Sequence, residues 1–398
     1  MKTESIPTYK KWLTQFDIAD KNYAKLLVES LTYYSTDFMM NSMSKQLEAI
    51  IQDIEGNIAL FTVRDSPKKE DFNNITYFPT DKNTQPDRIN NKRGTGSEGE
   101  IAHFIRDFCK RHNNCLDHPS INKMINKNVR QVFLINDTGI SGDQIQTFFT
   151  WFYSSKTIKS WNSYKLIKIS TFVFAITEEA EHLLKRTKGL FSIHNCLYCE
   201  NGYTKWPEKT TKRIIQLCNK YGQNLSKKIS PLGYNDSFNL TILSHKCPNN
   251  TPLIIWCDRN NWNPLIEPRP NTNFSYNEND VNNFIQELFN KLGRLIKKTN
   301  YLLKPETKYS IVILKLIYKN RRYNEKYFSK YLGLNRYQLN YYLTELQNFN
   351  WIDKNNNITP QGKKTVNYLT KGKKNRNTQS CIDENAEIYY PKSLWAPD

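Results

Sequence analysis

The sequence predicts an α/β protein with a parallel sheet covered by helices, followed by a small helical unit at a basic C-terminal end. Apolar runs of strand length alternate with amphipathic segments of helix length over residues 57–186, which is typical of a parallel sheet. The charge is uneven, because residues 291–380 hold 20 Lys and Arg but only 4 Asp and Glu, within a formal net charge of +19. The C-terminal end is therefore predicted to bind a polyanion.

The first elements are helices that precede a strand. An apolar stripe at helical spacing runs over 12–34, and a second helix is predicted over 36–54. The apolar run 57–64 predicts a buried strand, and the polar stretch 65–96 predicts a long surface loop. A further helix is predicted to begin at Ser97.

The next elements form a strand–helix–strand unit. A dense apolar strand is predicted over 129–135, and the loop 136–144 leads into an apolar helix over 145–155. A second strand over 164–176 and a helix over 177–186 follow. Such alternation places the carboxyl ends of the strands at one edge of the sheet, where ligands bind in open α/β folds.

The composition excludes several classes of protein. No run reaches the roughly 20 apolar residues that cross a bilayer, and the first residues lack the apolar stretch of a signal peptide, so a cytoplasmic protein without a membrane span is predicted. Eight cysteines at uneven spacings indicate free thiols. Cys196 and Cys199 have the spacing of metal ligands, but no second such pair exists, and no metal site is predicted.

The loop 136–144 (NDTGISGDQ) has the pattern of a sugar-phosphate site. Its glycines allow a short turn, and the backbone N–H groups at the start of the following helix can hold a phosphate. Asp137 is placed to accept hydrogen bonds from ribose hydroxyls, while an ordinary strand-to-helix loop is the alternative interpretation. The candidate catalytic residues are Asp137 and Asn136, and the candidate phosphate-binding residues are Thr138, Gly139, Ser141, Gly142 and Gln144.

The same loop resembles the phosphoribosyl-diphosphate (PRPP) signature of type I phosphoribosyltransferases. Asn136 and Asp137 fall on the acid pair of that signature, and Ser141-Gly142 fall on its Thr-Gly. The blocks WLTQFDIADKNYAKLL, GSEGE and WNPLIEPR are similar to phosphoribosyltransferase-like proteins of bacterial conflict and anti-phage systems, including retron-associated effectors. The similarity covers roughly residues 10–270, and the block Pro248–Trp256 is its most specific part.

This resemblance implies a Rossmann-like, type I phosphoribosyltransferase fold and displacement at the anomeric carbon of ribose. It implies PRPP, accompanied by Mg²⁺, as the ligand. Arg64 at the end of the first strand, Arg93 and Ser97 are the candidates for contact with pyrophosphate, and solvated surface arginines are the alternative. The sequence departs from the signature where Asn136 replaces the first acid and Asp143 adds a carboxylate to the loop.

The basic end has the pattern of a winged helix-turn-helix. An apolar helix over 309–319 precedes a short helix ending at Gly333, a longer helix capped by Asn335, and two short apolar runs joined by an Asn-rich turn. The alternative to nucleic-acid binding is a winged domain used for protein contact. The candidate nucleic-acid-binding residues are Arg336, Gln338, Asn340, Tyr341, Thr344, Lys354, Lys363, Lys364, Arg321 and Arg322.

Together these features predict a phosphoribosyltransferase-like domain over 1–270, a linker helix over 271–300, a winged helix-turn-helix over 301–372 and a flexible tail over 373–398. The predicted function is an effector of a bacterial anti-phage, retron-type defence system. Its first unit would bind PRPP or a nucleotide. Its winged unit would bind DNA or an RNA–DNA hybrid such as retron msDNA, and a reverse transcriptase is the expected protein partner. The alternatives are a non-catalytic, nucleotide-sensing transcriptional regulator and a structural subunit that docks a complex to DNA.

Overall fold

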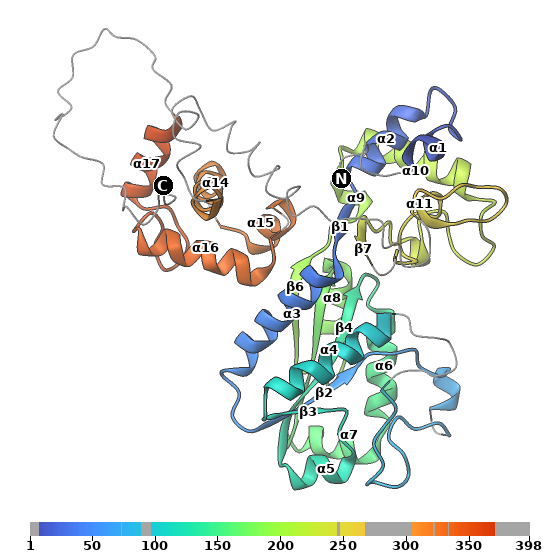
Figure 1. Ribbon diagram of the computed structural model, residues 1–398, viewed down its shortest axis with the longest axis vertical. Helices are drawn as coiled ribbons and strands as arrows, with labels where there is room; N and C mark the ends of the chain where they lie inside the picture. Colours follow the sequence, from blue (N-terminus) through green and yellow to red (C-terminus); the bar gives the residue numbers. More distant parts are fainter. Residues whose placement is uncertain are drawn as a thin grey trace. The chain divides into compact units, whose positions relative to one another are not determined.

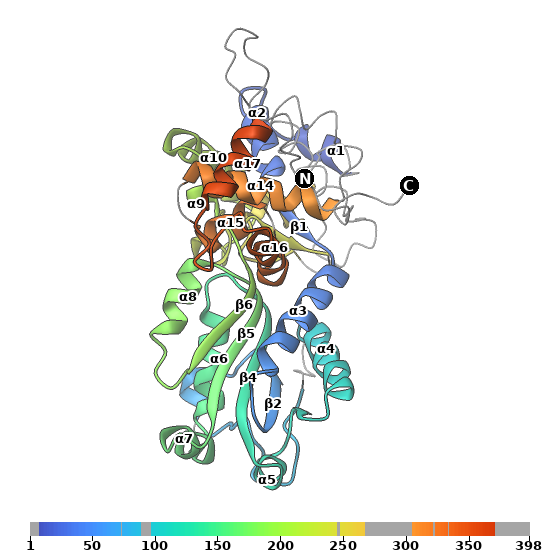
Figure 2. The same cartoon turned by 90° about the vertical axis from the view of Figure 1, so that its left-hand side faces the viewer.

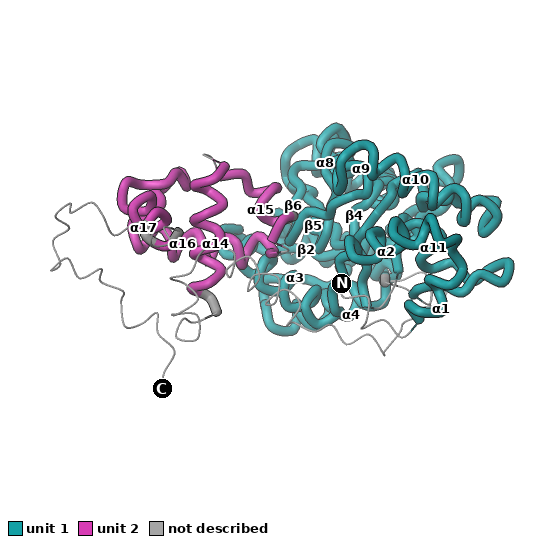
Figure 3. The backbone as a smooth tube through the Cα atoms, turned by 90° about the horizontal axis from the view of Figure 1, so that it is seen from above, with its two compact units in different colours: residues 1–276 teal, residues 277–398 magenta. Residues whose placement is uncertain are grey.

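The computed structural model of the chain describes residues 8–72, 74–88, 97–244, 247–266, 305–320, 323–332 and 334–370 (Figure 1). The chain divides into two compact units, residues 1–276 and 277–398 (Figure 3). The predicted linker helix and tail lie outside the described residues. Among the helices that the structure describes, none is both long and apolar enough to cross a bilayer.

The larger unit contains a five-stranded parallel sheet with the strand order β3-β2-β4-β5-β6 (Figure 2). This confirms the predicted α/β fold. The sequence pattern predicted neither β3 nor β6. A three-residue strand such as β3 has no readable periodicity. The strands are β2 (Asn57–Thr62), β3 (Cys115–Asp117), β4 (Val129–Gly139), β5 (Lys168–Ile176) and β6 (Ser192–Tyr198).

Two helices cover one face of this sheet (Figure 2). Helices α3 (Thr36–Ile51) and α4 (Ser97–Arg111) pack on a cluster that includes Leu60 of β2 and Phe133 of β4, both at most 1% exposed. The buried Cys196 and Cys199 belong to this apolar cluster. The thiol pair with metal-ligand spacing therefore packs as part of the core.

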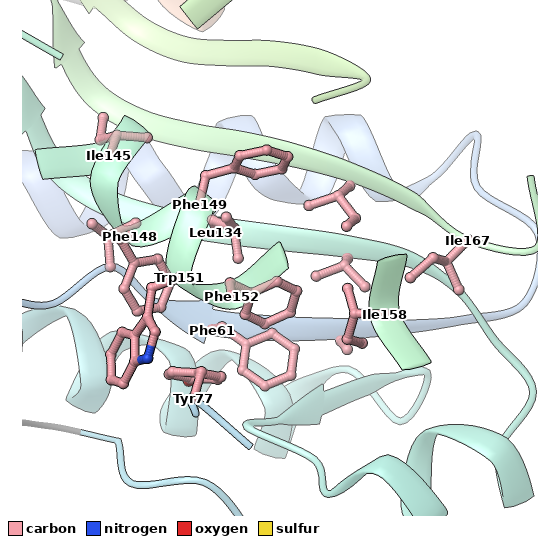
Figure 4. Packing of buried hydrophobic residues seen from close by; sticks show 14 of the residues in the cluster. Phe61, Tyr77, Leu134, Ile145, Phe148, Phe149, Trp151, Phe152, Ile158 and Ile167 are labelled. Carbon is pink, nitrogen blue, oxygen red and sulfur yellow. The ribbon is translucent and has the colours of Figure 1, made fainter. Parts of the chain in front are cut away.

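The opposite face carries an aromatic layer (Figure 4). Because successive strand residues point to opposite faces, Phe61 and Leu134 face this layer and meet Phe148 and Phe152. Burial of such large rings stabilises the sheet by about 2–3 kcal/mol each. The helices of this layer are α5 (Ile121–Asn126), α6 (Asp143–Tyr153), α7 (Lys156–Ser163) and α8 (Glu178–Lys185).

A further cluster joins the N-terminal helices to residues 202–266 (Figure 1). The prediction of one helical stripe over 12–34 is wrong at its end, because Thr32–Tyr34 form β1, which pairs in parallel with β7 (Thr241–Leu243). Pairing with a strand more than 200 residues away is invisible to local periodicity. The helices are α1 (Tyr9–Leu13), α2 (Lys21–Glu29), α9 (Gly202–Lys205), α10 (Glu208–Gly222) and α11 (Leu253–Trp256).

The smaller unit is a winged helix-turn-helix, as predicted. Its helices enclose a separate apolar core around Phe328 and Leu339. Asn335 begins the longer helix with a capping box closed by Gln338, and Ile352 pairs with Ile358 across the Asn-rich turn of the wing. The helices are α14 (Pro305–Asn320), α15 (Glu325–Leu332), α16 (Arg336–Asn348) and α17 (Pro360–Thr370).

Candidate functional site

A cavity of about 60 Å³ lies where β4 leads into α6. An ordered water needs roughly 10–15 Å³ of such space, so the cavity has room for about four waters or a group of similar size. One wall is formed by residues 137–142, 144 and 145, and the other by Leu243 and residues 248–250. Six of the seven predicted sugar-phosphate residues line it: Asp137, Thr138, Gly139, Ser141, Gly142 and Gln144.

The turn between β4 and α6 is shorter than predicted. The sequence suggested that the strand ends before Asn136, but β4 continues to Gly139. Asn136 and Gly139 remain paired with Val173 and Ile176 of β5, and this pairing overrides the low strand propensity of Asn, Asp and Gly. The turn is consequently reduced to residues 140–142, and Asp137 is held by a rigid strand.

The strand separates the two candidate catalytic residues. Asn136 is 4% exposed, does not line the cavity, and donates a hydrogen bond from Nδ2 to the carbonyl of Thr138 at 2.8 Å. Asp137 lines the cavity, and its Oδ1 accepts a hydrogen bond from the Thr138 N–H at 2.6 Å. Asn136 thus braces the strand end, while Asp137 provides a carboxylate at the cavity wall.

The turn is fixed from the neighbouring strand. Thr177, which directly follows β5, donates from Oγ1 to the Ile140 carbonyl at 2.6 Å and from its N–H to the Gly139 carbonyl at 3.1 Å. Gly142 has φ +81°, which disfavours any L-residue, and a Cβ at this position would lie only 3.2 Å from Ala180 Cα. Sequence analysis did not identify Thr177 as a support, since its partners lie about 37 residues earlier.

The start of α6 lies beside the cavity, and its first N–H, that of Asp143, donates to Ser141 Oγ at 3.4 Å. The first N–H groups of a helix have no partner within the helix, and Ser141 and Gly142 occupy this end of the cavity wall. Asp143, the added carboxylate, accepts a hydrogen bond from the side chain of Asn235 and does not line the cavity. The departure from the PRPP signature at this position therefore leaves the turn itself clear of a second negative charge.

Gln144 links the cavity to the loop after β2 and, through that loop, to α4. Its Nε2 donates to Oδ1 of Asp65, just after β2, at 3.4 Å, and the Asp65 N–H donates to Oε1 of Glu98 in α4 at 2.6 Å. The starts of α4 and α6 therefore meet the end of β2. This is the edge at which an open α/β sheet binds its ligand.

Of the three predicted pyrophosphate contacts, the structure describes the side chain of Arg64 alone, and Arg64 is not among the residues that line the cavity. Arg64 is 8% exposed, and its guanidinium carbon lies 4.9 Å from the centroid of Trp151 and 5.4 Å from that of Tyr77. These cation–π contacts place it in the aromatic layer next to the site. Ser97 begins α4, and its side chain, like the whole of Arg93, lies outside what the structure describes.

The second wall consists of residues to which sequence analysis gave no site role. Asn249 accepts a hydrogen bond through its carbonyl from the Tyr234 N–H at 2.8 Å, and Asn250 donates from Nδ2 to Ser237 Oγ at 3.0 Å. Gly233, with φ +95°, allows this close approach, because a Cβ there would lie 2.3 Å from the Asn250 carbonyl oxygen. The sequence feature that could have identified this wall is the block 248–256, the most specific part of the family resemblance. No spacing in the sequence shows that this block lies next to Asp137.

The winged unit uses two of the predicted nucleic-acid residues internally. Arg336 forms an ion pair with Glu325 of α15, and the Gln338 side chain accepts the Asn335 N–H in the capping box at 3.1 Å. Arg336 thus ties α16 to α15. Both side chains contribute to the stability of the helix-turn-helix.

The remaining described candidates are exposed. Asn340, Tyr341 and Thr344 lie on the outer side of α16, with Lys354 in the wing and Lys363 and Lys364 in α17. Sequence analysis missed Tyr337, which is 41% exposed one turn before Tyr341. The spacing of four residues between the two tyrosines was the available signal. Arg321 and Arg322 lie outside the described residues.

The fold and the cavity define a phosphoribosyltransferase-like protein that carries a winged helix-turn-helix. A family model described as PRTase-CE matches residues 9–267, and the chain belongs to this family. A second model, described as wHTH-PRTase associated, matches residues 311–396. The comparisons found no match among curated proteins or solved structures.

Proposed function

We propose that the larger unit binds a ribose-linked phosphate, as part of PRPP or of a nucleotide, in the cavity beside Asp137. The observation that supports this is the convergence of six predicted residues on one cavity at the carboxyl end of a central parallel strand. The N–H groups that start α6 and the Ser141 hydroxyl are donors for phosphate oxygens. The Asp137 carboxylate is an acceptor for the ribose hydroxyls.

In a displacement at the anomeric carbon, Asp137 would stabilise positive charge that develops on the sugar. Asp137 is the one carboxylate among the described residues that line the cavity. This donor set fits a Mg²⁺ that arrives with the substrate, because Mg²⁺ is commonly held by one or two carboxylates plus phosphate oxygens and water. When bound, the ion would neutralise charge on the leaving diphosphate.

Calorimetric titration of the full chain with PRPP, AMP and inorganic diphosphate tests this proposal. We expect Ser141→Ala to weaken binding of the phosphorylated ribose by about 10- to 100-fold, for a lost hydrogen bond to a charged group. Asp137→Asn should weaken it by removing the charged acceptor for the ribose hydroxyls. Thr150→Ala is the matched control for Ser141→Ala, because it also removes a hydroxyl, from an exposed residue of α6 that does not line the cavity. Absence of wild-type binding to all three compounds would contradict the proposal.

The winged helix-turn-helix supports a second binding activity, toward nucleic acid. Residues 305–370 contain eleven Lys and Arg against four Asp and Glu, and Lys354 and Lys363 are exposed at the wing and on α17. Cations in these positions neutralise phosphates, which makes binding depend on salt. Fluorescence anisotropy with labelled DNA, RNA and hybrid oligonucleotides over a salt series is the direct measurement.

The biological role that we propose is a defence effector of the retron type, in which bound nucleic acid such as msDNA restrains the phosphoribosyltransferase-like unit. The presence of both units in one chain and the similarity to conflict-system proteins support it. Expression should then be toxic, and Asp137→Ala should abolish the toxicity. Co-purification with a reverse transcriptase encoded nearby tests the proposed partner.

A transcriptional regulator that senses a nucleotide is the second candidate. It is favoured by Asn136, which braces the strand instead of presenting an acid, and by the cavity wall, in which no described residue is Lys or Arg. This function predicts tight binding to its own promoter, altered by AMP or PRPP, without toxicity on expression. Retained toxicity in the Asp137→Ala variant would also favour a function other than catalysis.

A further inference from the structure

The outer face of α16 carries four uncharged residues, two of which are tyrosines. Tyr337, Asn340, Tyr341 and Thr344 are spaced i, i+3, i+4 and i+7, which places them on one stripe of the helix. All four are exposed, the two tyrosines at 41% and 48%. The stripe therefore presents two aromatic rings one helical turn apart.

An aromatic stack anchors this stripe in the core of the winged unit. Tyr342 stacks on Tyr309 with ring centroids 5.0 Å apart and an interplanar angle of 3°, and both rings are at most 9% exposed. Tyr341 meets Tyr342 edge to face at 5.3 Å. The exposed ring of Tyr341 is thus held by a buried one, which reduces the entropy that a ligand must remove on binding.

The four residues of the stripe carry no charge. Arg336, at its start, is paired with Glu325, and the exposed Lys354 and Lys363 belong to the wing and α17. Direct reading of guanine in a duplex uses Arg or Lys on the recognition helix. The stripe instead offers rings for stacking and the short polar side chains of Asn340 and Thr344.

On this basis, and resting on the proposed nucleic-acid binding, we infer that the outer face of α16 binds unpaired bases of a single strand by stacking on Tyr337 and Tyr341. The two residues are about 6 Å apart along the helix axis, at 1.5 Å per residue, whereas bases along a strand of a duplex are about 3.4 Å apart. Two adjacent bases can reach both rings only after separating from each other, which a single strand permits. The exposed lysines of the wing and of α17 are the candidates for contact with its phosphates.

The test compares the full chain bound to a single-stranded oligonucleotide, the blunt duplex of the same sequence and the RNA–DNA hybrid. We expect tighter binding to the single strand. Tyr337→Ala and Tyr341→Ala should each weaken it by about 5- to 100-fold, the range measured for loss of one base–aromatic stack. Phe variants should bind like the wild type, since they keep the ring.

Two further measurements separate stacking from structural effects. Tyr318→Ala removes a tyrosine of similar exposure on α14, whose hydroxyl bonds to Asn367 of α17 at 3.3 Å, and it should leave binding unchanged. The salt dependence should stay the same in both α16 alanine variants, because no charge is lost. In the wild type, 2-aminopurine within the single strand should change its emission on binding.

The outcomes separate nucleic-acid binding by the winged unit from base stacking on α16. If the protein binds none of the probes, nucleic-acid binding by the winged unit is itself wrong. If it binds the duplex as tightly as the single strand, if Phe variants lose as much affinity as Ala variants, or if 2-aminopurine emission does not change, base stacking on α16 is wrong, although nucleic-acid binding stands.

Discussion

Replacing Gly142 by alanine should lower both the stability of the larger unit and its affinity for a phosphorylated ribose. Gly142 has φ +81°, a conformation that costs an L-residue about 1–2 kcal/mol. The added Cβ would lie 3.2 Å from Ala180 Cα and Cβ and from Leu183 Cδ2, and such overpacking costs about 1 kcal/mol or more. A total of roughly 2–3 kcal/mol corresponds to a fall in Tm of about 5–10 °C for a unit of this size.

Gly56→Ala is the matched control for this substitution. Gly56 has φ +91°, but its added Cβ would meet only Arg130 Cγ, at an ordinary 3.7 Å. The control should therefore show the conformational penalty alone, about 1–2 kcal/mol, with unchanged ligand affinity. Differential scanning calorimetry and titration with AMP measure both effects.

Either of two results would contradict the expected effects of Gly142→Ala. Equal destabilisation of the two variants would mean that contact with α8 adds nothing. Wild-type affinity in Gly142→Ala would mean that the conformation of the turn does not matter for the ligand, and the N–H groups at the start of α6 would then not be the phosphate donors.

Three further predictions concern pH, packing and salt. Burial lowers the pKa of His118, whose Nε2 accepts the Thr62 N–H at 2.9 Å. The unfolded chain therefore binds a proton at this residue more readily than the folded chain does. The free energy of unfolding should consequently fall by up to about 1.4 kcal/mol per pH unit below pH ~6.5. Urea unfolding at pH 7 and pH 5 should show this extra loss in the wild type and not in His118→Gln. Gly362→Ala would place a Cβ 2.1 Å from the Trp351 carbonyl oxygen, so it should destabilise the winged unit by about 3 kcal/mol and leave AMP binding intact in titration. Lys354→Gln should reduce the slope of log K against log salt for single-stranded DNA by about 0.7 in anisotropy.

The sequence predicted the parts of the fold that depend on local pattern. The helix that begins at Thr36 and the strand before Asn136 follow from periodicity, and the predicted cap Asn335 begins α16. Gln338, predicted as a nucleic-acid contact, instead closes the capping box. The end of β4 could not be predicted, because polar residues with low strand propensity remain paired with β5. Tertiary context decides such boundaries.

The candidate site was predicted on one side only. The wall from Asp137 to Gln144 is contiguous in sequence, so its Gly-rich turn after an apolar strand could be recognised. The wall at 248–250 is about 110 residues away, and it faces the first wall through tertiary structure that no local spacing encodes. The same holds for Thr177, which braces the turn from β5.

The N-terminal segment contributes to the cavity without touching it. Thr32–Tyr34 pair with Thr241–Leu243, and Leu243 lines the cavity at the end of this strand. Trp12, 0% exposed, donates from Nε1 to the Ile254 carbonyl at 2.6 Å, just beyond the second wall. Both contacts hold the segment that carries residues 248–250. Residues 8–34 therefore act in the site as the support of its second wall, so a chain without them should lose ligand affinity although every residue that lines the cavity is still present.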